Sequence, residues 1–347
     1  MGAVKRASNV TAARYPLLTP IASETIHWGI LGPGSIAHQF ASGLQSVPDA
    51  KLVAVGSRTQ EKADAFADKF DVPRRHASYA ALAADPDVHA VYIATPHPAH
   101  RDAALLCLDA GKAVLCEKPF TVNAREAGEV IDRARANDVF CMEAMWSRFF
   151  PAMAHVRNLV TDGTIGEARM LQADFGFRTD VNPQSRLFDP ALAGGGLLDV
   201  GVYTLSLASM LFGTPTQVSG VAQMGTTGVD EMAALSLLYA GGRIAALTTG
   251  IRINTPQEAL ILGTGGSITL HAPWWKPAKM TITVNGKAEE ITIPYEGSGM
   301  NYEAMEVGAC LRAGKTESTI LPLDETLSIM QTTDDLRRQW GLKYPME

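Results

Sequence analysis

The chain of 347 residues carries a formal net charge of −6, with 46% hydrophobic and 19% charged residues. This composition allows two domains of ordinary size with large cores and excludes a disordered chain. The mild acidity and the lack of a long Lys/Arg run argue against a nucleic-acid partner, and the apolar stretches are shorter than the roughly 18–20 residues of a membrane span.

Residues 1–25 differ in character from the rest of the chain. They hold Lys5, Arg6 and Arg14 but lack the apolar stretch of a signal peptide. We interpret them as an N-terminal arm or a leader. The four cysteines of the chain form no CxxC pair. They are expected to be buried, reduced thiols, which favours a cytoplasmic protein over a periplasmic one.

Residues 26–148 alternate short apolar runs with helical patterns. We expect strands at 26–32, 51–57, 90–95, 113–119 and 139–145. Helices are expected at 35–45, at 59–70, in the segment that stops at Gly111, and at 123–137, where NARE forms an Asn-x-x-Glu cap. The strict alternation of strands and helices predicts an α/β domain with a parallel sheet and helices on both faces.

The pattern changes after Pro151, in the region that we assign to a second domain at 149–347. A helix (151–162) and a strand (167–177) precede three glycines, and two helices (301–313 and 324–340) close the chain. Between them lie the expected strands 216–224, 231–240, 242–253, 258–264, 266–272, 279–284 and 289–295, separated by turn signals. This succession predicts an α+β domain with a large, mostly antiparallel open sheet.

A glycine-rich turn, GPGSIA, follows the first expected strand and opens the first helix. It fits the G-x-G-x-x-A form of the Rossmann fingerprint, in which Gly32 permits a tight turn and Gly34 lets the backbone approach a pyrophosphate. The helix N-terminus also offers N–H groups to phosphates. We expect dinucleotide binding by Gly32, Pro33, Gly34, Ser35, Ile36 and Ala37.

The end of the second expected strand lacks the acid that binds the ribose hydroxyls of NAD. It reads Gly56-Ser57-Arg58-Thr59. Ser57 can donate a hydrogen bond, and Arg58 can pair with a 2′-phosphate and stack on adenine. The predicted cofactor is therefore NADP. The alternative is that Ser57 and Arg58 form only a solvated turn.

Two further segments carry polar side chains in positions suited to chemistry. The segment EKP closes the fourth expected strand, so its lysine, Lys118, would point into the crevice at the carboxyl ends of the strands. In GGGLLDVGVY (194–203), Asp199 and Tyr203 are four residues apart, which places both on one face of a helix. Taken alone, these residues also fit a surface lysine and an ordinary capped helix.

These motifs together resemble a known family. GPGSIA, ATPHPAH at 94–100, EKP and GGGLLDVGVY are similar, in order and spacing, to the glucose–fructose oxidoreductase and inositol dehydrogenase family (Gfo/Idh/MocA). EAMWSRFFP at 143–151 and the ending GLKYP resemble its branch of dimeric dihydrodiol dehydrogenases and NADP-dependent D-xylose dehydrogenases. The resemblance covers nearly all of residues 26–345.

The resemblance implies site residues by position. The catalytic residues would be Lys118, Asp199 and Tyr203; a tyrosine where inositol-type members have histidine argues against inositol as the substrate. Beyond the glycine turn and Ser57 and Arg58, cofactor contacts would come from Thr95, Pro96, His97, His100, Glu117, Lys118, Trp146 and Arg148. No metal is expected, because His97 and His100 have no acidic or cysteine partner at a suitable spacing.

The substrate wall is expected to combine the catalytic residues with the end of the strand before the glycines. There Phe177 and Arg178 follow Phe175, although sheet packing explains them equally well. Trp274 and Trp275 fit either an interface or a lid, and the sequence does not decide between the two.

The implied chemistry is oxidation of a hydroxyl group. Tyr203 would take the hydroxyl proton while hydride leaves the same carbon, the Lys118 ammonium would favour the phenolate, and Asp199 would position the substrate or the lysine. We expect an NADP-dependent enzyme that oxidises a cyclic aldose at C1 to the lactone, with xylose or glucose as leading substrates. A homodimer through the large sheet is also expected.

Three alternatives stay open at this point. One is an aldose–aldose oxidoreductase with tightly bound NADP(H), in which residues 1–25 close over the adenine end of the cofactor. The second is a trans-dihydrodiol dehydrogenase. The third is a non-catalytic NADP-binding regulator, which the presence of Lys118, Asp199 and Tyr203 disfavours.

Overall fold

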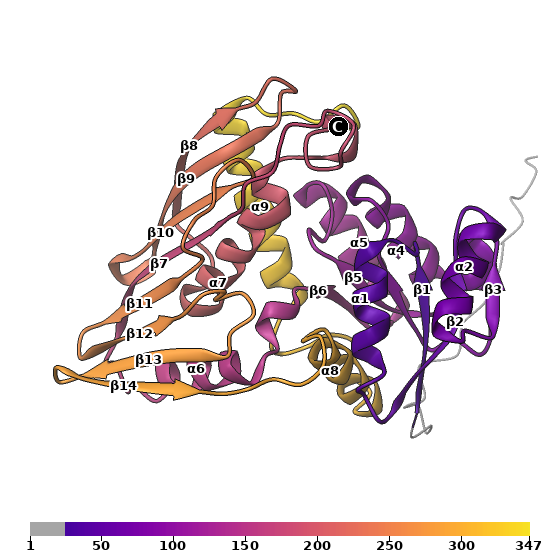
Figure 1. The fold of residues 1–347 in the computed structure, drawn as a ribbon, viewed down its shortest axis with the longest axis horizontal. Helices are drawn as coiled ribbons and strands as arrows, with labels where there is room; N and C mark the ends of the chain where they lie inside the picture. Colours follow the sequence, from indigo (N-terminus) through magenta and orange to yellow (C-terminus); the bar gives the residue numbers. More distant parts are fainter. Residues whose placement is uncertain (1–24) are drawn as a thin grey trace, which may run out of the picture.

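The computed structural model describes residues 25–347, which form two units, each built on its own sheet (Figure 1). The role expected for the N-terminal arm falls on residues 1–24, which lie outside the described residues. The first sheet belongs to the predicted Rossmann domain and the second to the predicted α+β domain. Both fold-class predictions are confirmed.

The first sheet has six parallel strands in the order β3-β2-β1-β4-β5-β6. Its strands are β1 (Ile26–Leu31), β2 (Ala50–Gly56), β3 (Arg74–His76), β4 (Ala90–Ile93), β5 (Ala113–Glu117) and β6 (Cys141–Ala144). Its helices are α1 (Ser35–Leu44), α2 (Gln60–Phe70), α3 (Tyr79–Ala83), α4 (His100–Asp109) and α5 (Ala124–Asn137). The strand order reverses between β1 and β4, which creates the crevice where such sheets bind dinucleotides.

Local chemistry explains these boundaries. The Asn123 side chain accepts a hydrogen bond from the Glu126 N–H, which caps α5 as predicted. Two elements escaped the sequence prediction: β3 has only three polar residues at the sheet edge, and α3 has five residues capped by Ser78. Neither is long enough to show a hydrophobic period.

The second sheet has eight strands in the order β14-β13-β12-β11-β7-β10-β9-β8. They are β7 (Ala168–Gly176), β8 (Gln217–Met224), β9 (Asp230–Tyr239), β10 (Arg243–Gly250), β11 (Ala259–Gly263), β12 (Gly266–Leu270), β13 (Lys279–Val284) and β14 (Lys287–Thr292). All neighbouring pairs are antiparallel except β7 and β10. The prediction of a mostly antiparallel sheet is therefore correct.

Helices cover one face of this sheet. They are α7 (Val202–Phe212), which contacts β7 and β10, and α9 (Leu323–Trp340), which contacts β8. The domain also contains α6 (Pro151–Thr161) and α8 (Asn301–Arg312), and α8 packs against α1 of the first domain. Figure 1 shows α7 and α9 between the large sheet and the first domain. Strand β9 alternates accordingly: Leu235 and Leu237 are buried, whereas Ala234 and Ser236 are exposed on the other face.

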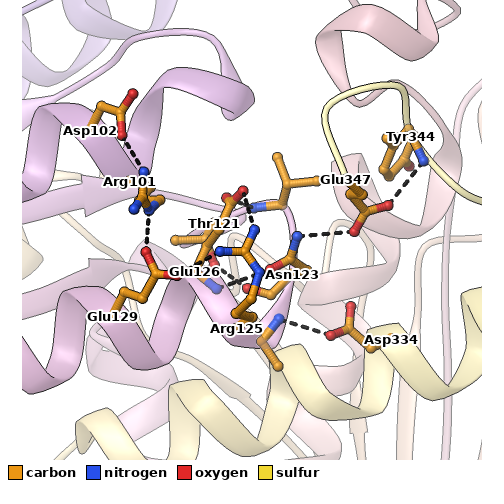
Figure 2. A network of polar contacts seen from close by, with 12 residues as sticks. Arg101, Asp102, Thr121, Asn123, Arg125, Glu126, Glu129, Asp334, Tyr344 and Glu347 are labelled. Carbon is orange, nitrogen blue, oxygen red and sulfur yellow. Dashed lines mark hydrogen bonds and ion pairs between the residues drawn. The ribbon is translucent and has the colours of Figure 1, made fainter.

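The last residues of the chain tie the two domains together. Figure 2 shows Glu347 reaching Asn123, whose side-chain amide donates to the Glu347 carboxylate at 3.0 Å. The Ala124 N–H at the start of α5 donates to Asp334 of α9 at 2.9 Å. The buried Arg337 guanidinium also binds Glu347 at 2.7 Å. The C-terminal segment therefore fixes the second domain against α5.

One segment, Pro190–Phe212, is long and apolar enough to cross a membrane by length and composition alone. Of its most apolar window, 89% is buried inside the structure. This is the pattern of a core helix in a globular protein, and α7 forms the second half of the segment. All four cysteines are buried and free, as expected.

Candidate active site

The carboxyl ends of β1, β2, β4 and β5 open into a cavity of about 550 Å³. Its wall includes the glycine turn, the end of β2, the residues after β4 and the EKP segment. From the second domain it includes Arg186 and Leu192, in the loop between β7 and α7. The cavity therefore lies where the strand order reverses, at the contact between the two domains.

The glycine turn is shaped for a pyrophosphate. Gly32 has a φ of +83°, and a Cβ there would lie 2.9 Å from the Ala94 carbonyl oxygen, so only glycine fits. A Cβ at Gly34 would meet nothing within 4 Å, and no side chain caps the N-terminus of α1. Open space in front of an uncapped helix start suits an anionic group. Pro33, Ser35 and Ile36 also line the cavity, whereas Ala37 is buried beneath it.

The adenosine end of the cavity carries two cations. Ser57, which is buried, and Arg58 line it as predicted, together with Lys62 and Tyr79. Arg58 directly precedes the N-cap of α2, and Lys62 lies in the first turn of that helix, so both charges line the same wall of the cavity. This end fits a 2′-phosphate, and the dinucleotide that the cavity fits is NADP. Lys62 and Tyr79 were not predicted.

At the other end, Lys118 meets Asp199. The Lys118 Nζ donates to the Asp199 backbone carbonyl at 2.7 Å and lies 3.5 Å from its Oδ1. The same Nζ lies 5.0 Å from the centre of the Tyr203 ring. The Lys118–Pro119 peptide bond is cis. The structure therefore brings together all three residues that the sequence analysis assigned to catalysis.

The helix that carries Asp199 differs from the prediction. Asp199 lies in a π-helical turn, Leu197–Gly201, that continues into α7. The expectation of a regular α-helix through both Asp199 and Tyr203 was therefore wrong. A π-turn inserts an extra residue into the helix and is frequent at functional sites. The three glycines before it permit a close backbone approach that a period-based prediction does not capture.

Asp199 is held as a carboxylate. The Arg186 Nη1 donates to its Oδ1 at 2.7 Å. Burial alone would raise the pKa of Asp199, but the charges of Lys118 and Arg186 outweigh it and lower that pKa to about 2. Arg186 was not predicted, because it lies in a loop whose sequence has no recognisable motif.

Tyr203 is a buried phenol. Its hydroxyl oxygen accepts a hydrogen bond from the Trp146 indole N–H at 2.8 Å. Burial and the nearby Glu117 raise the pKa of Tyr203 well above its ordinary value. The expectation that Lys118 favours the phenolate was wrong for this arrangement, because its ammonium faces the ring rather than the hydroxyl. At neutral pH the phenol keeps its proton.

Aromatic rings surround the phenol. Trp275 stacks on Phe175 with ring centres 5.0 Å apart, and Phe175 lies edge-on to Tyr203 at 5.3 Å. Trp275 also contacts Trp146, at 5.8 Å. We call Trp146, Phe175, Tyr203 and Trp275 the aromatic wall. Trp275 thus belongs to the site, whereas Trp274 is fully buried and donates to the Asp174 carbonyl.

The residues after Phe175 make hydrogen bonds with β10 and the segment that follows it, not with the Tyr203 phenol. Phe177 is partly buried, and its N–H donates to the Gly250 carbonyl. Arg178 is exposed and pairs through its backbone with Arg252 and the Asn254 side chain. The structure therefore brings Phe175, not Arg178, to the phenol.

The loop after β4 is held by histidines. Thr95, Pro96, His97 and His100 line the cavity. The His100 ring lies 2.8 Å from both the Pro119 and the Thr95 carbonyl oxygens. Burial, then the charges of His100 and Lys118, lowers the pKa of His97 to about 3, so its ring is neutral. In the described part of the chain the Thr95 hydroxyl is buried without a partner, which fits a polar group of the cofactor.

Arg148 lies away from the cavity. Its buried guanidinium donates to the Ser206 carbonyl at 3.0 Å and forms an ion pair with Glu325 at 2.7 Å. The expectation that it packs over the cofactor does not agree with this geometry, because α7 and α9 enclose its side chain. Among residues 25–347, no group of three His, Cys, Asp or Glu side chains is arranged to hold a metal ion.

A dinucleotide cavity with a lysine, a carboxylate and a phenol at one end defines an oxidoreductase. The family model described as "Oxidoreductase family, NAD-binding Rossmann fold" matches residues 26–145, and the GFO/IDH/MocA C-terminal domain matches residues 153–269. The chain belongs to the Gfo/Idh/MocA family of oxidoreductases.

Among the similar proteins are enzymes named trans-1,2-dihydrobenzene-1,2-diol dehydrogenase. The chain is 42% identical to trans-1,2-dihydrobenzene-1,2-diol dehydrogenase of Mus musculus over 334 residues, which are 93% of this chain and 99% of the relative. The same enzyme of Homo sapiens is 39% identical over 334 residues, with the same coverage.

Solved structures share the fold. Aldose–aldose oxidoreductase from Caulobacter crescentus superposes with a TM-score of 0.84 at 23% identity, over 91% of this chain and 98% of that one. KijD10, a 3-ketoreductase from Actinomadura kijaniata in complex with NADP and TDP-benzene, has a TM-score of 0.81 at 24% identity, over 90% and 97%. At this identity the likeness shows the fold alone.

Proposed function

We propose that the protein is an NADP-dependent dehydrogenase that oxidises a cyclic aldose, of the xylose or glucose type, at C1 to the lactone. The observation that supports this most is the meeting of Lys118, Asp199 and Tyr203 at the end of the dinucleotide cavity opposite Arg58 and Lys62. The aromatic wall beside them offers apolar surface to the C–H face of a sugar ring.

Each residue has a distinct task. When bound, NADP⁺ accepts the hydride at its nicotinamide ring. One N–H of the Lys118 ammonium is used by the Asp199 carbonyl, which leaves the others for the substrate oxygen. Asp199 holds the lysine in place. In oxidation Tyr203 first loses its own proton to solvent, and the small fraction of phenolate then takes the substrate's hydroxyl proton; in reduction the neutral phenol donates its proton to the substrate oxygen.

A trans-dihydrodiol is the second candidate substrate. The relatives that carry this name are up to 42% identical over nearly the whole chain. The aromatic wall also suits a carbocyclic diol, which has a larger apolar face than a pyranose. Both substrates present a ring hydroxyl beside a second hydroxyl, so Lys118 and Tyr203 would act on them in the same way.

The test uses the purified protein with NADP⁺ or NAD⁺ and D-xylose, D-glucose or trans-1,2-dihydrobenzene-1,2-diol. We expect reduction of NADP⁺ by an aldose, with a kcat/KM at least tenfold above that with NAD⁺. Reduction only by the dihydrodiol would replace the first candidate by the second. No reduction with any of the three would contradict both.

The rival aldose–aldose oxidoreductase is tested with the same protein. After gel filtration and denaturation, the supernatant is assayed for NADP(H). Near-stoichiometric cofactor that D-xylose or D-glucose reduces without exchange would favour the rival. A protein purified without cofactor that reduces added NADP⁺ would favour the conventional dehydrogenase. We propose separately that this enzyme is cytoplasmic.

We also propose a homodimer through the uncovered face of the large sheet. Most side chains on this face of the central strands are uncharged, namely Gln172, Ala234, Ser236, Ala246, Thr248 and Leu260, with Asp174 and Glu258 as the two carboxylates among them. Val221, on the neighbouring β8, is 73% exposed. A largely uncharged sheet face suits a self-complementary contact. Ala234→Arg should convert a dimer into a monomer in analytical ultracentrifugation, and a monomeric wild type would contradict the proposal.

A further inference from the structure

The three glycines before the catalytic π-turn are packed against other parts of the chain. A Cβ at Gly194 would lie 2.7 Å from the Leu187 carbonyl oxygen. Gly195 has a φ of +121°, and a Cβ there would lie 2.2 Å from the Asp230 Oδ1. Glycine is therefore required at Gly195 because the Asp230 carboxylate occupies the space of a side chain.

Asp230 is the first residue of β9 and is fully buried. Its Oδ2 accepts a hydrogen bond of 2.6 Å from the Leu197 N–H, the first residue of the π-turn. The N–H groups at a helix start lack partners within the helix, so an oxygen acceptor is needed there. Burial raises the pKa of Asp230 to about 7, and in either protonation state the side chain keeps an oxygen that can accept the Leu197 N–H. Asp230 thus caps the catalytic turn from a different element.

The other side of the same entry is held by the C-terminal segment. The Tyr344 hydroxyl donates to the Gly194 carbonyl at 2.7 Å. Figure 2 shows Tyr344 beside Glu347, whose carboxylate accepts from the Tyr344 N–H and from Asn123. The glycine segment is therefore clamped between β9 and the segment that joins the two domains.

The clamp leads directly to the catalytic residues. Asp199 lies two residues after Leu197, and its N–H donates to the Gly195 carbonyl at 3.2 Å. Its own carbonyl then receives the Lys118 Nζ. A shift of Leu197 would move the acceptor that fixes the Lys118 ammonium. Misplacement of a reacting group by about 1 Å can cost on the order of 100-fold in rate.

We propose that Asp230 is a positioning residue of the active site, which acts by capping Leu197 so that Asp199 holds Lys118 at the substrate. The inference rests on the proposed function in one respect only, the role of Lys118. Asp230 touches neither the lysine nor the cavity wall, and its substitution leaves the NADP site itself intact.

The test compares Asp230→Ala with Asp230→Asn in the full-length protein. The alanine variant should lower kcat at least tenfold and leave the Kd for NADPH, measured by fluorescence, within twofold. The asparagine variant should recover most of kcat, because its amide oxygen can accept the Leu197 N–H. Gly195→Ala, which displaces the carboxylate from the other side, should reproduce the loss.

Asp85→Asn is the matched control, since Asp85 is a buried carboxylate of the first domain without contact to the π-turn. It should leave kcat unchanged. Wild-type kcat in Asp230→Ala, or equal loss of kcat in the alanine and asparagine variants, would overturn the positioning role.

Amide hydrogen exchange tests the role of Asp230 as a cap independently of which substrate the enzyme uses. The peptide 194–203 should exchange faster in Asp230→Ala than in wild type and Asp230→Asn, whatever the substrate is. A wild type that turns over none of the tested substrates would overturn the proposed function, while unchanged exchange at 194–203 would overturn the cap.

Discussion

The phenol of Tyr203 offers the sharpest test of the mechanism. In Tyr203→Phe the proton carrier is lost, which should lower kcat by about 10²- to 10⁴-fold. The Trp146 N–H also loses its hydrogen-bond acceptor, the Tyr203 oxygen. An unpaired buried donor costs about 1–3 kcal/mol, and Tm falls by about 2–4 °C for each kcal/mol in a domain of about 150–250 residues.

The assay combines steady-state kinetics, NADPH fluorescence and thermal unfolding. The Kd for NADPH should not change, because Tyr203 does not line the cofactor cavity. Since the pKa of Tyr203 is raised, wild-type oxidation should also accelerate with rising pH, and this dependence should vanish in the variant. Tyr239→Phe, at another buried tyrosine, serves as the control. A Tyr203→Phe enzyme with kcat within threefold of wild type would refute the proton role.

Three further substitutions test separate parts of the account. Arg58→Ala should weaken NADPH binding by about 10- to 100-fold, the loss of a charge-assisted contact of about 1.5–3 kcal/mol, and weaken NADH binding much less in the same titration, because NADH shares the adenine but lacks the 2′-phosphate. Lys118→Met should reduce kcat by at least 100-fold in steady-state assays with only a modest fall in Tm, because Arg186 still pairs with the Asp199 carboxylate when the lysine is lost. Burial raises the pKa of Glu143 from 4.5 to about 7. The folded state therefore binds this proton more tightly than the unfolded state, and the free energy of unfolding should fall by about 3 kcal/mol as pH rises from about 4.5 to 7. Glu143→Gln should flatten that pH dependence in denaturant titrations, and an unchanged slope would contradict the burial argument.

The sequence predicted the fold closely because its signals are local. Apolar runs, helix caps such as Asn123 and turn signals mark most strands and helices, and alternation of strand and helix implies a parallel sheet. The missed elements, β3 and α3, are too short for any periodic pattern. The π-turn was also missed, because the contact that accompanies it, between Gly195 and Asp230 of β9, joins residues distant in sequence.

The site was predicted less completely. Lys118, Asp199 and Tyr203 were found because they lie in motifs, and the structure brings them together. Arg186 and Trp275 were not assigned to the site, because each lies in a loop and reaches it only through the fold. The protonation of Tyr203 was misjudged for a related reason: burial depends on the surrounding aromatic wall, which no single segment reveals.

The most direct test of the central claim follows the hydrogen itself. The protein is incubated with NADP⁺ and D-xylose that carries deuterium at C1, and the reduced cofactor is analysed by mass spectrometry. The account predicts deuterium in the NADPH and a slower reaction than with unlabelled sugar. NADPH without deuterium, or no NADPH at all, would contradict hydride transfer from C1.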